Sequence, residues 1–139
     1  MGQGGEETVK PTPKLEGLAG EFYGWLKKRE LRFQCCSACG AWRHVPRVLC
    51  ATCGSSEWTW RRSMGRGRLF TWTVVVRPMH EAFVNDSPYA PAVIELEEGV
   101  RLLSEVVDCD PDALEIDMPV EVVFEDVTDE VTLPKFRRV

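Results

Sequence analysis

Apolar side chains recur at helical spacing near the N-terminus. Leu18, Phe22, Trp25 and Leu26 fall at i, i+4, i+7 and i+8, which is one stripe of an α-helix. Basic side chains follow directly and favour the end of a helix there. The pattern predicts a helix within residues 15–31.

The segment before the predicted helix has a different composition. Residues 1–14 are rich in Gly, Pro, Thr and Glu and contain few packing side chains. Such a composition is typical of a flexible tail or linker. It also fits the remnant of a connection to a further domain.

From residue 58 onward, alternation and β-branched runs predict strands. A short helical turn is expected at residues 110–114, behind a proline. Five strands with a helical turn between the third and fourth are the order of an OB-fold barrel, here over residues 63–139. Periodicity alone also allows another small antiparallel barrel or a sandwich. The expected strands are residues 68–77, 92–96, 101–107, 120–124 and 131–136.

The first of these runs predicts which side chains enter the barrel. It alternates without interruption after two glycines, Gly65 and Gly67, that are expected to break the chain before it. Alternate residues of a strand point to opposite faces, and the bulkier set is expected in the core. The predicted core set is Phe70, Trp72, Val74 and Val76, and the predicted outer set is Leu69, Thr71, Thr73 and Val75.

Four of the six cysteines form two pairs with identical spacing. Two residues separate the cysteines of each pair, ten residues separate the pairs, and a glycine follows each second cysteine. This spacing turns two sulfurs toward one ion, and glycine accepts the positive φ that closes the turn. We expect a rubredoxin-like zinc ribbon over residues 32–62 with one structural Zn²⁺ on Cys36, Cys39, Cys50 and Cys53; iron or a redox dithiol are the alternatives.

Two other side chains lie close to this motif. Cys35 alternates with the apolar Leu31 and Phe33, which predicts a buried position outside the metal site. His44 lies between the cysteine pairs. Since four cysteines already complete a tetrahedron, His44 is expected on the ribbon surface.

Charge is distributed unevenly along these 139 residues, whose net charge is −5. Residues 27–77 carry 11 basic against 2 acidic side chains, and residues 95–132 carry 14 acidic against 1 basic. The basic half suits a short phosphorylated ligand, and the acidic half repels a long polyanion. The longest apolar runs are far shorter than the roughly 20 residues of a membrane span. We expect a cytoplasmic protein whose thiols stay reduced.

The order of the motifs resembles a known family. After the helix and the short-gap cysteine ribbon come SMGRGRLFTWTVV, a Pro-Met-His loop, AVIELEEGVRL and MPVEVVFE. This order is similar to that of the acyl-CoA-associated zinc-ribbon/OB-fold family, once called domain of unknown function thirty-five. The likeness extends over about residues 18–136.

The resemblance implies a mostly β fold and a function in partnership. Family members accompany thiolase-fold enzymes, either as the required partner of an aldolase that cleaves a steroid side-chain β-hydroxyacyl-CoA by retro-aldol reaction, or as a bridge between a thiolase and hydroxymethylglutaryl-CoA synthase. It implies a heteromeric complex with two copies of each subunit, and an enoyl-CoA hydratase as a further partner. The family's metal ligands map onto the four paired cysteines, and no catalytic residue maps onto this chain.

The residues also suggest where a partner and a ligand bind. Large aromatic side chains on the helix and on the long loop before residue 91 are candidate anchors for a partner. Arginines of the ribbon are candidates for the phosphates of an acyl-CoA shared with the partner. The candidate anchors are Phe22, Trp25, Phe83 and Tyr89, and the candidate phosphate contacts are Arg43 and Arg47.

A second hypothesis is an OB-fold protein that binds nucleic acid. Phe70 and Trp72 would then stack on bases. The acidic stretch in the same barrel opposes this reading, because such a groove needs a positive potential.

Overall fold

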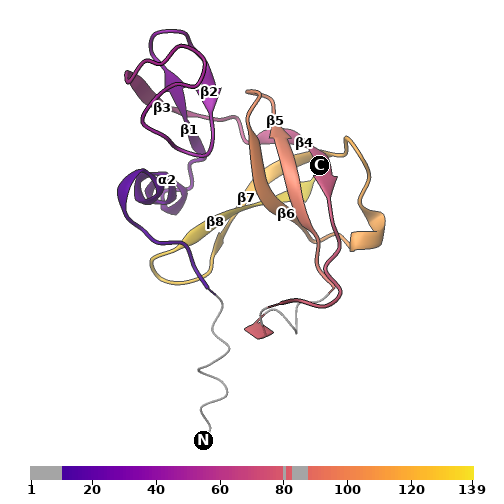
Figure 1. Ribbon diagram of the computed structural model, residues 1–139. Helices are drawn as coiled ribbons and strands as arrows, with labels where there is room; N and C mark the ends of the chain where they lie inside the picture. The colour runs from indigo at the N-terminus through magenta and orange to yellow at the C-terminus, as the bar shows by residue number, and fades with distance from the viewer. Residues whose placement is uncertain (1–10, 80, 83–87) are drawn as a thin grey trace, which may run out of the picture.

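The computed structural model describes residues 11–79, 81–82 and 88–139 (Figure 1). One helix is followed by a three-stranded ribbon and then by a closed barrel of five strands. The predicted fold class is therefore confirmed. In Figure 1 the helix lies below the ribbon and beside β8 of the barrel, and it contacts both.

Helix α2 spans Gly17–Lys27 and buries Phe22 and Leu26, one turn apart on the predicted stripe. These side chains belong to one hydrophobic cluster that also contains barrel residues. Two charged contacts fasten the end of the helix to the barrel: Lys27 donates to the carbonyl of Asp129, and Arg29 forms a bidentate pair with Asp126. The Arg29 guanidinium holds the pKa of Asp126 well below its usual range.

The ribbon is a sheet in the order β2-β1-β3. Its strands are β1 (Arg32–Cys36), β2 (Trp42–Arg43) and β3 (Trp58–Arg62). The central strand β1 ends on the first paired cysteine, so the first metal-binding turn begins where the strand stops.

The barrel closes in the order β4-β5-β6-β8-β7. All pairs are antiparallel except β6 with β8, which pair only at Val106 with Phe136 and at Val107 with Arg137. A single-turn helix η2 (Pro111–Ala113) stands where the helical turn is predicted, and the Asp110 carboxylate caps it. This is the OB-fold arrangement. The strands are β4 (Arg66–Trp72), β5 (Pro91–Leu96), β6 (Arg101–Val107), β7 (Pro119–Asp126) and β8 (Thr132–Arg138).

The predicted faces of the first barrel strand are wrong at Leu69, Val74 and Val76, whereas Trp72 packs on the core as predicted. Strand β4 contains Gly67 and ends at Trp72, and its register with β5 shifts between Leu69 and Thr71. This bulge at Phe70 changes the alternation, so that Leu69 is fully buried and Trp72 packs partly against the core. Beyond the strand, Val74 and Val76 are exposed, although both were predicted in the core.

The burial of Leu69 and the partial burial of Trp72 can be compared by measuring the unfolding of variants. We expect Leu69→Ala to cost about 2 to 5 kcal/mol, because it empties a closed part of the core. Trp72→Ala is expected to cost less, since solvent fills part of the space that its ring leaves. Urea unfolding of both variants checks the order, and a larger loss for Trp72→Ala would contradict the observed facing.

Candidate functional site

The four paired cysteines come together at one end of the ribbon. Their sulfur atoms all lie within 4.8 Å of one another. The Cys36 and Cys53 sulfurs are 3.6 Å apart, and the Cys39 and Cys50 sulfurs are 3.7 Å apart. A tetrahedral zinc with bonds of about 2.3 Å needs sulfur-to-sulfur edges of about 3.8 Å. The donor set therefore fits Zn²⁺ in both chemistry and spacing, as predicted.

The two cysteine turns have the same backbone geometry. Gly40 and Gly54 both adopt φ of +79°, the left-handed region that glycine enters without strain. The Gly40 N–H donates to the Cys36 carbonyl at 2.9 Å, and the Gly54 N–H donates to the Cys50 carbonyl at 2.8 Å. A side chain at either glycine would strain the turn that aims the two sulfurs.

The same turns direct backbone donors at the sulfurs. The N–H groups of Cys53 and Thr52 lower the pKa of Cys50 to about 6. The Ala41 N–H likewise lowers the pKa of Cys39. Desolvation and the neighbouring thiols outweigh this effect and raise the pKa of Cys39 to about 12. The thiols share protons in this cluster, and a dication would replace those protons.

The cluster has a buried side and an exposed side. Cys36 and Cys50 are buried, while Cys39 and Cys53 are exposed. With four thiolate ligands the ion would have no open position for a substrate, so it would be structural. Cys35 is buried outside the cluster, as predicted, with its sulfur 3.5 Å from the Gly40 carbonyl oxygen.

A buried polar network lies beside the metal-binding turns. Gln34 is fully buried, and its Oε1 accepts from the Arg43 Nε at 3.0 Å and from the Arg47 N–H at 2.8 Å. The Gln34 Nε2 and the Arg43 Nη2 both donate to the Arg47 carbonyl. The alternation of the sequence does not reveal this network, because it predicts Gln34 on the outer face of the strand.

The two arginines predicted to contact phosphate differ in their exposure to solvent. Arg43 is 8% exposed and uses its guanidinium inside the chain, so the prediction of a phosphate contact there is wrong. Arg47 is exposed. Only Arg47 retains the accessible guanidinium that the predicted contact requires.

His44 is not the surface residue that the sequence predicts. Its ring lies 4.8 Å from that of Phe22 and 5.3 Å from that of Phe33, between the helix and the ribbon. Desolvation by this burial lowers the pKa of His44 to about 4. A neutral imidazole packed against two aromatic rings stabilises the fold and takes no part in the metal site.

The His44 environment predicts a pH dependence of stability. Because the unfolded histidine, with a pKa near 6.5, binds protons more readily than the folded one, stability falls as pH decreases from about 6.5 toward 4. Between pH 7.5 and pH 5.5 this loss amounts to about 1 kcal/mol. Urea unfolding of His44→Phe at both pH values is expected to show a loss smaller by that amount. Equal losses in the two proteins would contradict the assignment.

The four predicted anchors have different positions. Phe22 is 3% exposed and packs on its own ribbon, so it is a core residue of this chain and not a surface anchor. Trp25 is half-buried, with the Arg32 guanidinium 4.4 Å from its ring centre. Tyr89 is half-buried and bridges to Val75. Phe83 lies outside the described residues.

Phe70 and Trp72, the rings predicted to stack on bases in a nucleic-acid-binding protein, both make contacts within the barrel. The Arg101 guanidinium lies 3.8 Å from the Phe70 ring centre. Trp72 packs against the core. Neither ring stands free in the way that the nucleic-acid hypothesis requires.

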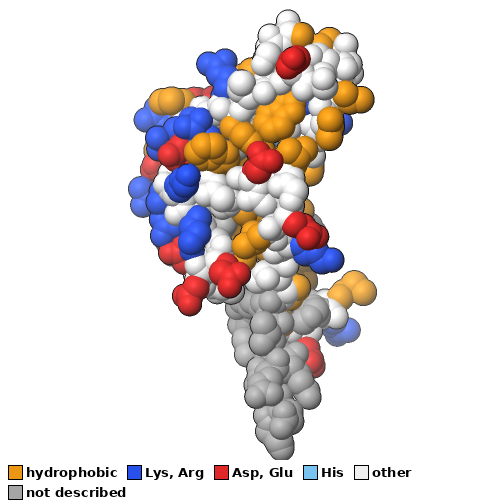
Figure 2. Space-filling model, turned by 90° about the vertical axis from the view of Figure 1, so that its left-hand side faces the viewer, with side chains coloured by type: hydrophobic (Ala, Val, Ile, Leu, Met, Phe, Trp, Pro, Cys, Tyr) orange, Lys and Arg blue, Asp and Glu red, His pale blue; other side chains and the backbone are white. Residues whose placement is uncertain are grey.

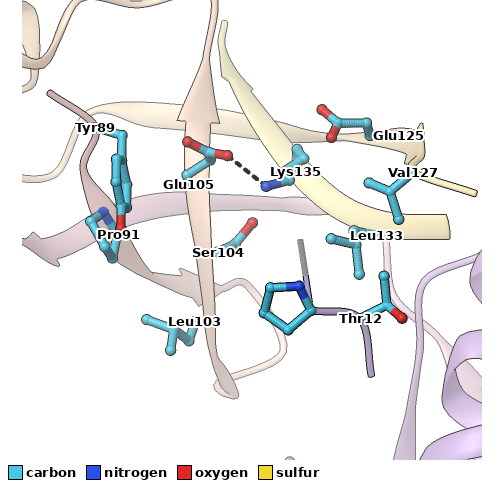
Figure 3. A pocket seen from close by; sticks show the side chains of 11 residues that line it. Thr12, Tyr89, Pro91, Leu103, Ser104, Glu105, Glu125, Val127, Leu133 and Lys135 are labelled. Atoms are coloured by element: carbon cyan, nitrogen blue, oxygen red, sulfur yellow. Dashed lines mark hydrogen bonds and ion pairs between the residues drawn. The ribbon is translucent and has the colours of Figure 1, made fainter. Parts of the chain in front are cut away.

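A cavity of about 540 Å³ opens where β6 and β8 separate. Figure 3 shows Tyr89 and Pro91 on one side, Leu133 and the N-terminal Thr12 on the other, and an ion pair between Glu105 and Lys135. A second cavity of about 560 Å³ adjoins it between α2, the ribbon and the barrel. The two cavities share Leu103, Ser104, Leu133 and Lys135. The second cavity is largely apolar, whereas the first is also lined by acidic side chains.

Ion pairs connect the basic and acidic halves of the sequence. Besides Arg29 with Asp126, Arg68 pairs with Glu95 and Asp117. Figure 2 shows Lys and Arg side chains gathered along one side of the face that contains α2 and the ribbon, with Asp and Glu beside them. Part of the predicted charge asymmetry is therefore neutralised within the fold.

Comparisons with known proteins agree with this architecture. Residues 26–59 match the rubredoxin-like zinc ribbon domain of ChsH2, and residues 60–125 match its C-terminal OB-fold domain. A DUF35 domain-containing scaffold protein of Methanothermobacter thermautotrophicus is 40% identical over 98 residues, which are 68% of this chain and 71% of that protein. The chain belongs to the DUF35 family.

Solved structures of DUF35 proteins share the fold. The Ltp2-ChsH2(DUF35) aldolase matches with a TM-score of 0.83 and 36% identity, over 91% of this chain and 98% of that chain. A DUF35 protein of unknown function from Sulfolobus solfataricus matches with a TM-score of 0.65 at 16% identity, over 91% of this chain and 89% of that chain, which supports the fold alone.

Two longer relatives carry hydratase names. A probable enoyl-CoA hydratase alpha subunit of Thermomonospora curvata is 36% identical over 131 residues, which are 94% of this chain but 40% of that protein. The 3-oxo-4,17-pregnadiene-20-carboxyl-CoA hydratase alpha subunit of Mycobacterium tuberculosis is 35% identical over 108 residues, which are 78% of this chain and 34% of that protein. This chain thus spans well under half the length of these relatives.

No helix in the described part of the chain is both long enough and apolar enough to cross a bilayer.

Proposed function

We propose that this DUF35 chain is the non-catalytic subunit of a heteromeric thiolase-fold aldolase that acts on a steroid side-chain β-hydroxyacyl-CoA. The observation that carries the proposal is the match to nearly the whole DUF35 chain of the Ltp2-ChsH2(DUF35) aldolase, at 36% identity. The steroid-CoA name of the Mycobacterium tuberculosis relative supports the substrate class.

The chemistry of the described side chains supports a non-catalytic role. Retro-aldol cleavage needs a base for the β-hydroxyl proton and donors for the thioester oxygen that becomes an enolate. In the described part of the chain, the one histidine packs between two aromatic rings, and the carboxylates of Glu95 and Asp126 pair with arginines. Those groups do not converge on a common point. The reacting groups are therefore assigned to the partner.

Three finer features belong to the same proposal. Acyl-CoA is a ligand shared with the partner, with the exposed Arg47 as its phosphate contact in this chain. The complex contains two copies of each subunit. An enoyl-CoA hydratase on another part of the protein or on another polypeptide supplies the β-hydroxyacyl-CoA, and the reduced thiols suit the cytoplasm.

Reconstitution tests the proposal. The chain alone, the Ltp2 subunit alone and the two together are assayed on a β-hydroxy steroid acyl-CoA by following release of the short acyl-CoA. We expect no turnover by the chain alone and clear activity of the mixture above that of Ltp2 alone, because association stabilises the competent enzyme. Turnover by the isolated chain would refute the non-catalytic role, and an unchanged Ltp2 activity would refute the partnership. Light scattering of the complex measures the stoichiometry.

The scaffold name of the archaeal relative supports a second candidate. This relative is 40% identical over 98 residues, and the second candidate is a bridge between a thiolase and hydroxymethylglutaryl-CoA synthase. Co-purification with both of those enzymes, without binding to Ltp2, would favour the bridge.

A further inference from the structure

Exposed apolar side chains gather in one turn of the ribbon, between the two cysteine pairs. Val45, Val48 and Leu49 are 66%, 63% and 55% exposed. Single exposed apolar residues are common on protein surfaces, but a contiguous group is typical of a contact surface. Residues 45–49, with Arg47 at the centre, are here called the ribbon tip.

The tip is held rigidly from inside. The N–H of Arg47 donates to the Gln34 Oε1, and the carbonyl of Arg47 accepts from both the Gln34 Nε2 and the Arg43 Nη2. These bonds fix the backbone at the centre of the tip while its side chains point outward. A loop already ordered in this way loses little entropy when it binds.

The chain maintains this rigidity at a cost. Arg43 is buried without a carboxylate partner among the described residues, and its Nη1 has no hydrogen bond there. The Trp58 ring, 6.0 Å away, compensates only in part. A buried charge without an acid is expensive. The metal site does not need the buried Arg43, because the cysteine turns supply all four ligands. The role left for the hydrogen bonds of Arg43 and Gln34 is to hold the backbone of the tip in its shape.

We infer that the ribbon tip docks into an apolar pocket with an acidic rim on the thiolase-fold subunit. This rests on the proposed function. The apolar side chains of the tip require an apolar pocket. The exposed Arg47, which has no ion pair within the described residues, requires a carboxylate at the edge of that pocket. Its guanidinium has five N–H donors, so a CoA phosphate can bind beside the carboxylate. The largely apolar second cavity, which Val45 lines, accommodates a side chain of the same partner.

A second copy of this chain is a poorer occupant. A two-fold contact places the same patch on both sides. Arg47 would then face Arg47, and like charges across an interface oppose association.

Binding to immobilised Ltp2, measured without CoA, tests the inference with matched variants. Val48→Asp is expected to bind about 30-fold more weakly, the effect of losing an interface hot spot. Ile116 is 62% exposed, nearly as much as Val48 at 63%. The segment that follows η2 lies away from the ribbon in Figure 1, so Ile116→Asp in this segment is the control variant. It is expected to bind within about twofold of wild type. Arg47→Gln tests the acidic rim and is expected to bind about tenfold more weakly. Zinc content and melting temperature verify that each variant folds.

The outcomes separate the inference from the function on which it rests. Wild-type protein that does not bind Ltp2 would overturn the proposed function itself. Wild-type binding that Val48→Asp leaves unchanged, or that Ile116→Asp weakens equally, would overturn the docking role of the tip. A self-associated wild-type chain that Val48→Asp converts to monomer would assign the tip to a second copy and also overturn the inference.

Discussion

We expect Cys39→Ser to lose zinc and to unfold the ribbon. Residues 32–62 are too few to bury a stabilising core of their own. Structural zinc in such small modules contributes about 10 to 16 kcal/mol of apparent binding free energy, and serine is a poor substitute for a thiolate. The barrel is expected to remain folded, because its strands close on one another without the ribbon.

Metal analysis and tryptophan fluorescence measure this loss. Zinc is expected to fall from about one per chain to near zero, with a red shift of emission as the ribbon opens. The shift reports on the ribbon because four of the five tryptophans lie in the helix and ribbon: Trp25, Trp42, Trp58 and Trp60.

A matched cysteine variant provides the control. Cys109 lies outside the sulfur cluster, so Cys109→Ser is expected to keep both the zinc and the native emission. A Cys39→Ser protein with a full complement of zinc, or a wild-type chain that folds completely under a strong chelator, would disprove the structural role of the metal.

Gly67→Ala is expected to have the largest effect within the barrel. A Cβ atom at this position would lie 2.3 Å from the Glu95 carbonyl oxygen and 3.0 Å from the Leu96 Cα. Both obstacles are backbone of the paired strand β5, which cannot rotate away as a side chain can. The substitution would force β4 and β5 apart where the barrel closes, and we expect a loss of about 3 kcal/mol or more.

The helix supplies a matched glycine. A Cβ atom at Gly24 meets nothing within 4 Å, and alanine favours a helix over glycine by about 1 kcal/mol. Gly24→Ala is therefore expected to raise stability slightly. Thermal and urea unfolding of the two variants are compared, and a Gly67→Ala protein as stable as wild type would show that β4 and β5 are less closely packed.

Local spacing was sufficient to predict the four-cysteine cluster and the order of the elements. Two cysteine pairs closed by glycines encode their own turns, since the relevant geometry spans four residues. The strand at residues 101–107 and the helical turn near Pro111 were likewise predicted where they occur, because proline, glycine and apolar alternation act over a few residues.

Side-chain placement depended instead on contacts between distant segments. Alternation placed Leu69 and Trp72 on opposite faces, but a bulge against β5 brings both onto the inner face. His44 and Arg43 look like surface residues in sequence, yet the helix covers the first and Gln34 binds the second. Burial depends on which elements pack together, and neither a bulge nor a buried hydrogen-bond network has a periodic signature along a single chain.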